Sequence, residues 1–196
     1  MALTAAGAGG PFDYYMLTLS WAPDFCAAPG GKKDARECGA GRHVGFVVHG
    51  LWPQANAGRG PENCGPASPV AQGIVNVMLN YFPTAGLIQH EWSAHGTCSG
   101  VSAAEYFAMV RKARDGVRIP AAFEGFTRPL EESAGEIEGQ FAAANPGFPK
   151  GAFRATCTGG TLQEARICFD KNLKPQACTA SAGECRMPSM RVLPPR

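Results

Sequence analysis

The chain has 196 residues, of which 45% are hydrophobic and 17% charged, and its formal net charge is +2 at pH 7. This apolar content excludes an intrinsically disordered chain. So small a net charge excludes the binding of a polyanion by broad electrostatic attraction, which needs many Lys and Arg contacts to phosphate. No apolar run approaches the roughly 18 residues of a membrane span, so we expect no membrane partner.

The length is that of one domain with a single hydrophobic core. We expect this domain over residues 12–196, preceded by a flexible N-terminal segment at 1–11. That segment has neither the basic start nor the apolar run of a signal peptide. We therefore expect a protein from which an export signal has already been removed.

The first half of the chain predicts two strands, a loop and two helices. Residues 12–21 and 44–49 are aromatic or apolar and are typical of short buried strands. Residues 56–69 are crowded with Gly, Pro and Asn and predict a loop. A helix is expected over 70–81, opened and closed by prolines, and another over 91–98.

The second half predicts a mixture of helices and strands. Ser102 and Glu105 match a capping box, so a helix is expected from there to about Asp115. Residues 130–144 are a further helix candidate, and 153–157 and 162–169 read as strands joined at a pair of glycines. Because strands and helices do not alternate regularly, the pattern favours the α+β class over a doubly wound parallel sheet.

The cysteines are even in number, and none of their spacings matches a CxxC metal or redox motif. In a chain of this kind such a set indicates disulfide bonds formed in an oxidising compartment. We therefore expect a periplasmic or secreted protein. The eight cysteines are Cys26, Cys38, Cys64, Cys98, Cys157, Cys168, Cys178 and Cys185.

Three of the four histidines lie in two short segments, the first of which is Phe46-Val-Val-His-Gly-Leu-Trp-Pro53. Histidine exchanges protons near neutral pH, with an unperturbed pKa of about 6.5, so one histidine from each segment could supply an acid and a base. His49 stands at the end of an apolar strand, where a rigid sheet would present it to a cleft. Trp52 is a candidate stacking surface for a flat ring, although each residue taken alone is as consistent with packing.

The second segment, Gln89-His-Glu-Trp-Ser-Ala-His-Gly-Thr-Cys98, begins like a zinc motif. Its second histidine stands at i+5 rather than i+4. On a helix, His90 and His95 would therefore not lie on the same face to coordinate one metal ion. We therefore expect no metal and no cofactor. Glu91 and His95 are at i and i+4, where a carboxylate can orient an imidazole, or where the two can form a mere surface pair.

In this order and separation, the two histidine segments resemble the active-site segments of the ribonuclease T2 family. Two further segments agree. Leu19-Ser-Trp-Ala-Pro-Asp-Phe-Cys26 is similar to the opening of bacterial, periplasmic members of the ribonuclease I type, and Ile167-Cys-Phe-Asp-Lys-Asn-Leu-Lys-Pro175 to a segment near the family's end. The resemblance runs from Asp13 to Cys185 and implies a central, mainly antiparallel sheet flanked by helices and held by disulfides.

The resemblance also implies a reaction. Family members cleave single-stranded RNA without metal through a 2′,3′-cyclic phosphate, using the 2′-hydroxyl as nucleophile, with low base specificity. His95 would be the general base and His49 the general acid, while His90 would hold the phosphate. Glu91 would polarise the phosphate or orient His95. Base recognition would involve Trp52, by stacking, and Gln54, where members tune base preference.

The chain departs from the family pattern at Ala94, where members usually carry lysine. If that lysine stabilises charge on phosphorus, its loss would cost about 10²- to 10³-fold in turnover. Arg42, Arg59 or another cation could replace it. The main alternative function is therefore a catalytically weakened relative that binds or stores RNA or nucleotides, and a zinc hydrolase is a remote one.

The resemblance further implies how the cysteines pair, which sequence spacing leaves open among 105 connectivities. It also implies that the protein acts as a monomer on its RNA substrate. The implied disulfides are Cys26 with Cys38, Cys64 with Cys98, Cys157 with Cys185 and Cys168 with Cys178.

Overall fold

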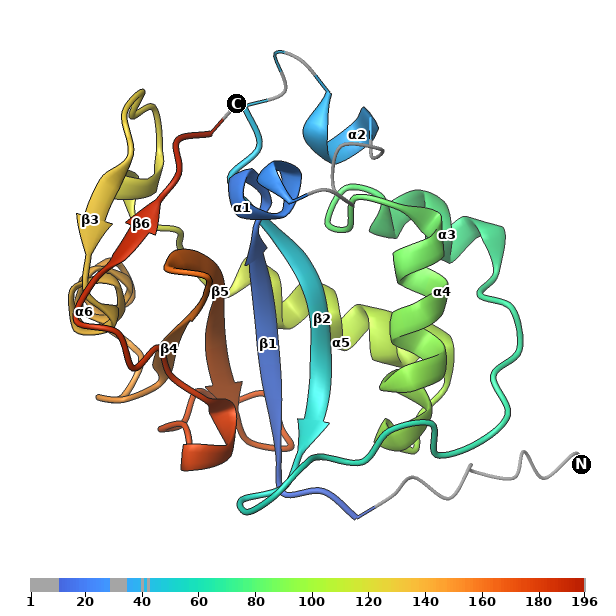
Figure 1. Ribbon diagram of the computed structural model, residues 1–196. Coiled ribbons are helices and arrows are strands. Elements are labelled where there is room, and N and C mark those ends of the chain that lie inside the picture. Colours follow the sequence, from blue (N-terminus) through green and yellow to red (C-terminus); the bar gives the residue numbers. More distant parts are fainter. Residues whose placement is uncertain (1–10, 29–34, 40, 42, 196) are drawn as a thin grey trace, which may run out of the picture.

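The computed structural model describes residues 11–28, 35–39, 41 and 43–195 (Figure 1). The segment expected to be flexible at 1–11 lies almost wholly outside these residues. The single-domain boundary at 12–196 therefore stays a prediction.

Strands and helices are interspersed along the chain, as the α+β prediction requires. Within the described part of the chain, three one-turn 3₁₀ helices connect them, of which Gly96–Ser99 matters for the site. In chain order the main elements are β1 (Tyr14–Trp21), α1 (Ala22–Ala27), α2 (Ala35–Cys38), β2 (Phe46–Gln54), α3 (Gln72–Met78), α4 (Ala85–Ala94), α5 (Ala103–Asp115), β3 (Leu130–Glu132), α6 (Ala134–Ala144), β4 (Phe153–Thr158), β5 (Thr161–Phe169) and β6 (Met190–Val192).

The strands form one 6-stranded sheet in the order β2-β1-β5-β6-β3, with β4 also pairing with β5. Every pairing is antiparallel except that of β5 with β6, which is parallel. In Figure 1, β2, β1 and β5 lie side by side, α5 crosses behind them, α3 and α4 cover the side of β2, and α6 lies near β3. The predicted α+β fold with a mainly antiparallel sheet flanked by helices is confirmed.

Strand β2 runs five residues beyond the predicted end at His49, to Gln54. Pro53 has no backbone N–H to give to a sheet. Among the described strands, β2 is the terminal one of the sheet order and pairs with β1, and at such an edge a proline can be accommodated. His49 therefore lies within the strand rather than at its end.

The helix predicted over 91–98 is two elements. Helix α4 begins at Ala85, where the Thr84 side chain accepts a 3.1 Å hydrogen bond from the Leu87 N–H and caps it. It ends at Ala94, and His95 is the residue between it and the 3₁₀ turn that follows. The predicted helix over 70–81 is shorter, at Gln72–Met78.

The candidate helix over 130–144 was wrong in its first turn. Residues Leu130–Glu132 form strand β3, and helix α6 begins only after Ser133, whose side chain and Glu136 form a capping box. The capping box predicted at Ser102 and Glu105 is confirmed. The strands predicted over 153–157 and 162–169 are confirmed as the hairpin of β4 and β5.

Strand β1 is covered on both faces. Its residues Tyr15, Leu17, Leu19 and Trp21 belong to the main hydrophobic core, which includes residues of the helices. The alternate residues point to the opposite face, where a small cluster contains Tyr14, Met16, Cys168 and Ala182, with Trp52 packed against it. This second face of the sheet carries the chemistry described below.

The structure contains the four disulfides that the family resemblance implied: Cys26–Cys38, Cys64–Cys98, Cys157–Cys185 and Cys168–Cys178. Cys64–Cys98 joins the long loop after β2 to the 3₁₀ turn after α4. Within the described part of the chain, no helix is both long and apolar enough to cross a membrane.

Candidate active site

A β-bulge places His49 and Trp52 on one face of the sheet. The register between β1 and β2 shifts between Thr18 and Leu19, so that the pairing skips His49. Side chains alternate along a regular strand, so two residues three apart would point to opposite faces. The extra residue at the bulge brings both side chains to the same face of the sheet. The ring centroids of His49 and Trp52 are 5.0 Å apart.

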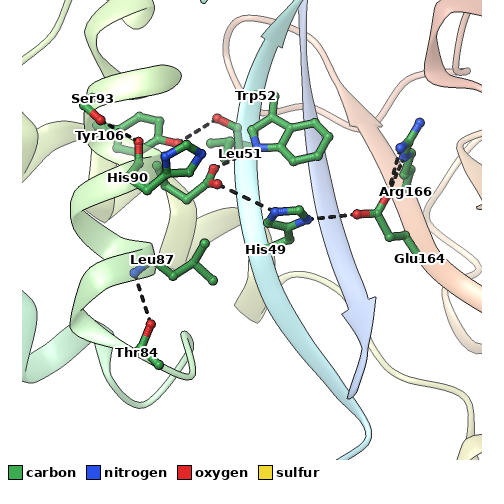
Figure 2. Close-up of polar contacts among 11 residues, drawn as sticks. His49, Leu51, Trp52, Thr84, Leu87, His90, Ser93, Tyr106, Glu164 and Arg166 are labelled. Carbon is green, nitrogen blue, oxygen red and sulfur yellow. Dashed lines mark hydrogen bonds and ion pairs between the residues drawn. The ribbon is translucent and has the colours of Figure 1, made fainter. Parts of the chain in front are cut away.

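His49 lies between two acidic side chains. Its Nδ1 lies 2.8 Å from Oε1 of Glu164 on β5, and its Nε2 lies 3.9 Å from Oε1 of Glu91 on α4. Figure 2 shows His49 between Trp52 and Glu164, with Arg166 beyond Glu164. Burial lowers the pKa of His49, but the Glu164 hydrogen bond and the charges of both carboxylates outweigh it and raise this pKa above its usual value.

Glu91 is fully buried beneath the site. Its Oε2 accepts a 2.7 Å hydrogen bond from the Trp52 indole N–H, while its Oε1 is buried without a hydrogen-bond partner among the described residues. Burial raises the pKa of Glu91 to about 7, against the opposing effects of His49 and Trp52. Gly50 makes this approach possible, because a Cβ there would collide with the Glu91 carboxylate and the Trp52 indole nitrogen.

His95 also packs against Trp52, with ring centroids 5.1 Å apart. It is 9% exposed, and its Nδ1 is buried without a hydrogen-bond partner among the described residues. Burial, together with the charges of His90 and His49, lowers the pKa of His95 to about 4. His95 is therefore neutral at pH values where His49 is still protonated.

The expectation that Glu91 orients His95 through a side-chain contact is not met. Helix α4 ends at Ala94, and His95 leaves helical geometry with φ −121° and ψ −40°. The carboxylate of Glu91 instead contacts Trp52 and His49. Spacing along a helix could not reveal this, because both partners come from β2.

The remaining predicted residues surround this centre or lie near it. His90 is exposed on α4, and its charge acts on His95. Gln54 is half-buried at the end of β2. Ala94 is 6% exposed, and its carbonyl accepts a 2.8 Å hydrogen bond from the Asn63 N–H. Of the suggested replacement cations, Arg42 lies outside the described residues.

Sequence reasoning missed Glu164 and Arg166, which the structure brings against His49 and Trp52. Arg166 donates from Nε and Nη2 to Oε2 of Glu164, at 2.9 and 2.7 Å, and its guanidinium lies 5.8 Å from the Trp52 ring centroid. One signal was present in the sequence. Glu164 and Arg166 stand at i and i+2 in an otherwise largely apolar strand, so they share one face of the sheet. Charged groups buried on such a face are usually paired with other charged or polar groups.

An apolar hollow of about 210 Å³ opens beside His49. It is lined by the exposed ring of Phe25 and by Val47, Pro83 and Leu87, among others. Among the described residues, no group of three or more His, Cys, Asp or Glu side chains is arranged to hold a metal ion. The site is thus a pair of histidines of opposite pKa shift beside a place where a flat apolar group could lie.

A disulfide-linked α+β domain with two such histidines on one face of its sheet is the framework of an acid–base enzyme. The sequence profile of the Ribonuclease T2 family matches residues 12–178. The chain is 33% identical to a ribonuclease of Aeromonas hydrophila over 175 residues, covering 87% of this chain and 77% of the relative. It is 32% identical to a probable ribonuclease of Haemophilus influenzae, covering 86% and 61%.

Solved structures of other proteins share the fold of this chain. An RNase-related protein from Calystegia sepium aligns with a TM-score of 0.71 at 23% identity, covering 95% of this chain and 98% of the other. A variant of RNase MC1 in complex with 5′-UMP aligns with a TM-score of 0.68 at 24% identity, covering 87% and 94%. The chain belongs to the ribonuclease T2 family, and with it to the endoribonucleases.

Proposed function

We propose that this endoribonuclease cleaves single-stranded RNA, without metal and with low base specificity, by transphosphorylation. The 2′-hydroxyl oxygen bonds to phosphorus, the bond from phosphorus to O5′ breaks, and a 2′,3′-cyclic phosphate results. Water then opens the cyclic product to a 3′-phosphate. The opposite pKa shifts of His49 and His95, whose rings both pack against Trp52, are the observation that carries this proposal.

His95 takes the proton of the 2′-hydroxyl. A general base must be neutral before the reaction, and the burial that lowers the pKa of His95 to about 4 keeps it neutral over most of the pH range. Its Nδ1 is buried without a hydrogen-bond partner among the described residues, so we assign the proton transfer to Nε2, the other ring nitrogen. In the second step the same residue returns the proton to the 2′ oxygen.

His49 gives its proton to the departing O5′. A general acid must be protonated before the reaction, and the two carboxylates beside His49 favour its charged form. Proton transfer to a poor leaving group contributes about 10²- to 10⁴-fold in rate. The roles reverse when water attacks the cyclic phosphate.

His90 and Glu91 act on the phosphate. His90 is exposed beside His95, where a cation could hold a phosphate oxygen. Glu91 has a pKa near neutrality, about 7, so its carboxyl group can carry a proton and donate it to a phosphate oxygen, which an ionised carboxylate cannot do. Its Oε1 lies 3.9 Å from Nε2 of His49 and has no hydrogen-bond partner among the described residues, but this atom is buried, so the substrate must displace neighbouring groups to reach it.

Trp52 and Gln54 contact the base. The half-buried Trp52 ring supports this role because both histidine rings pack against it, and the RNase MC1 variant bound to 5′-UMP supports a nucleotide ligand for this fold. DNA lacks the 2′-hydroxyl and would bind without being cut. We further propose that the protein works as a monomer in the periplasm or outside the cell, where its four disulfides are stable.

The test is cleavage of single-stranded RNA in excess EDTA by the wild-type chain and by His49→Ala and His95→Ala, with the cyclic phosphate identified among the products. We expect wild-type activity to survive EDTA and each substitution to lower kcat/KM at least about 10²-fold. His43→Ala is the matched control, because this exposed histidine precedes the same strand outside the site. Activity that depends on metal, or that survives both substitutions, contradicts the mechanism.

One observation favours a second candidate, a weakened relative that binds RNA or nucleotides. Ala94 stands where family members usually carry lysine, and it is buried against the loop that holds Asn63. In the same assay this candidate predicts tight RNA binding with no cyclic phosphate formed by the wild-type chain. Formation of that product at rates that fall in the two histidine variants excludes it.

A further inference from the structure

Glu164 is buried next to His49, and the reaction proposed above uses it only as one of the two charges that favour protonated His49. Its side chain is 4% exposed, and each of its oxygens has a charged partner. Its Oε1 lies 2.8 Å from Nδ1 of His49. Its Oε2 accepts two hydrogen bonds from Arg166, at 2.9 and 2.7 Å. A carboxylate is rarely buried unless it is paired in this way.

The sheet brings Glu164 and His49 together across an intervening strand. They lie on β5 and β2, which both pair with β1, and Ser20 of β1 stands opposite Glu164. The next residue of β1 on that face is Thr18, which stands opposite Arg166. Because the β1 side chains there are small, the longer side chains of the outer strands can meet above them, as Figure 2 shows for His49 and Glu164.

The hydrogen bond to Glu164 decides which nitrogen of His49 faces the substrate. An ionised carboxylate can only accept, so Nδ1 must carry a hydrogen and donate it. Burial raises the pKa of Glu164, but the His49 hydrogen bond and the Arg166 charge outweigh it and hold this pKa below its usual value. Glu164 therefore stays ionised, and Nε2 remains the nitrogen that gains and loses the exchangeable proton.

We propose that Glu164, held by Arg166, is a positioning residue for His49: it fixes the imidazole with Nε2 directed to the leaving oxygen and stabilises its protonated form. The proposal rests on the assignment of His49 as general acid. A buried carboxylate that orients a catalytic imidazole is a recurring arrangement in enzymes, and its removal lowers turnover by leaving the imidazole in the wrong tautomer. Glu91, the other charged group facing His49, lies on the Nε2 side and cannot do this.

The first experiment compares two substrates that differ in the leaving group. One is a dinucleoside monophosphate, whose O5′ must be protonated as it leaves, and the other a nucleoside 3′-nitrophenyl phosphate, whose leaving group needs no proton. We expect Glu164→Gln to lower kcat/KM about 10- to 100-fold for the dinucleotide. For the nitrophenyl ester we expect less than about a threefold loss, because general acid catalysis contributes little there.

The second experiment is the pH profile of kcat/KM for the dinucleotide. Removal of the Glu164 charge lowers the pKa of His49, because Glu164 is one of the groups that raise it, while Arg166 and burial act in the opposite direction. The alkaline limb of the profile should therefore move to lower pH in Glu164→Gln. The acidic limb, set by His95, should stay in place.

Glu138→Gln is the matched control. This glutamate of α6 also pairs with an arginine of the sheet, with Oε2 3.3 Å from Nη1 of Arg154, and it also accepts a hydrogen bond on its other oxygen. We expect no change in either the leaving-group ratio or the pH profile. Arg166→Lys gives a second test in a variant that keeps the buried charge balanced, and it should shift both quantities in the direction of Glu164→Gln by a smaller factor.

A double substitution separates this proposal from the function on which it rests. If Glu164 acts through His49, Glu164→Gln should change kcat/KM less than about twofold in the His49→Ala background. The same loss in both backgrounds, an equal loss for both leaving groups, or an unchanged alkaline limb overturns the positioning role. If His49→Ala itself cleaves the dinucleotide at the wild-type rate, the acid assignment fails instead.

Discussion

The indole N–H of Trp52 donates a 2.7 Å hydrogen bond to Oε2 of the fully buried Glu91. This bond joins β2 to α4, and so joins the first histidine segment to the second. It also gives the most buried acidic group of the site its one short hydrogen bond. The residue proposed to stack on the base is thereby also a structural partner of the group proposed to act on phosphate.

The buried Glu91 should make the protein less stable as pH rises. Its pKa is raised from 4.5 to about 7, so between these values the folded state binds more protons than the unfolded state, and stability falls with rising pH. Glu91→Gln keeps an acceptor for Trp52 and removes the charge. We expect denaturant unfolding to give a gain of up to about 3 kcal/mol at pH 8 and little gain at pH 4; equal effects at both pH values contradict the prediction.

Gly50 should tolerate no side chain. A Cβ there would collide with the Glu91 carboxylate and the Trp52 indole nitrogen, so Gly50→Ala must separate β2 from α4. We expect a loss of about 1 to 3 kcal/mol in the free energy of unfolding, together with reduced RNA cleavage. Gly65→Ala, in open space, should change neither quantity. Wild-type behaviour in Gly50→Ala would mean that Glu91 can move at no cost.

The rate of RNA cleavage should follow a bell-shaped pH profile. Its acidic limb reports His95, with a pKa of about 4, and its alkaline limb reports His49, with a pKa above its usual 6.5. The activity should therefore be highest from mildly acidic to near-neutral pH. Measurement of kcat/KM against pH with a dinucleotide checks this, and an acidic limb centred near the ordinary histidine value would place His95 outside the buried environment described.

Ala94→Lys should increase the rate. The position is buried, but a lysine stem can lie along apolar surface while its ammonium group reaches water or a phosphate. We expect kcat to rise about 10-fold or more if the added charge stabilises the transition state. Ala94→Met, which adds similar length without charge, is the control. An equal effect of both substitutions would assign the change to packing.

Much of the framework could be predicted from local patterns. Strands at Tyr14–Trp21 and Thr161–Phe169 follow from aromatic and apolar runs bounded by turn residues, and the helix at Ala103–Asp115 follows from a capping box. All of these are properties of neighbouring residues. The disulfide pairs came from the family resemblance rather than from spacing. The end of the second strand was predicted too early, because its place at the edge of the sheet, where Pro53 is tolerated, depends on tertiary structure.

The candidate site was predictable in its members but not in its contacts. His49, Glu91 and His95 could be named because reactive side chains crowd two segments. The hydrogen-bond partner of Glu91 could not be predicted from the sequence, because helical spacing suggested His95 and in the structure the partner is Trp52. Glu164 lies 115 residues from His49 in the chain, and only the pairing of β1 with both β2 and β5 brings them within hydrogen-bond distance.

By itself, the sequence determined which side chains could exchange protons, the family, and the chemistry to be expected of two histidines. Tertiary structure decided the surroundings of the two histidines, on which the proposed roles of His49 as acid and His95 as base rest. One bulged residue turns His49 to the face of Trp52, burial lowers the pKa of His95, and a carboxylate from a distant strand supports His49. The pKa of a histidine depends on its solvent exposure and on the charges within a few ångströms, and both are set by contacts between residues far apart in the chain.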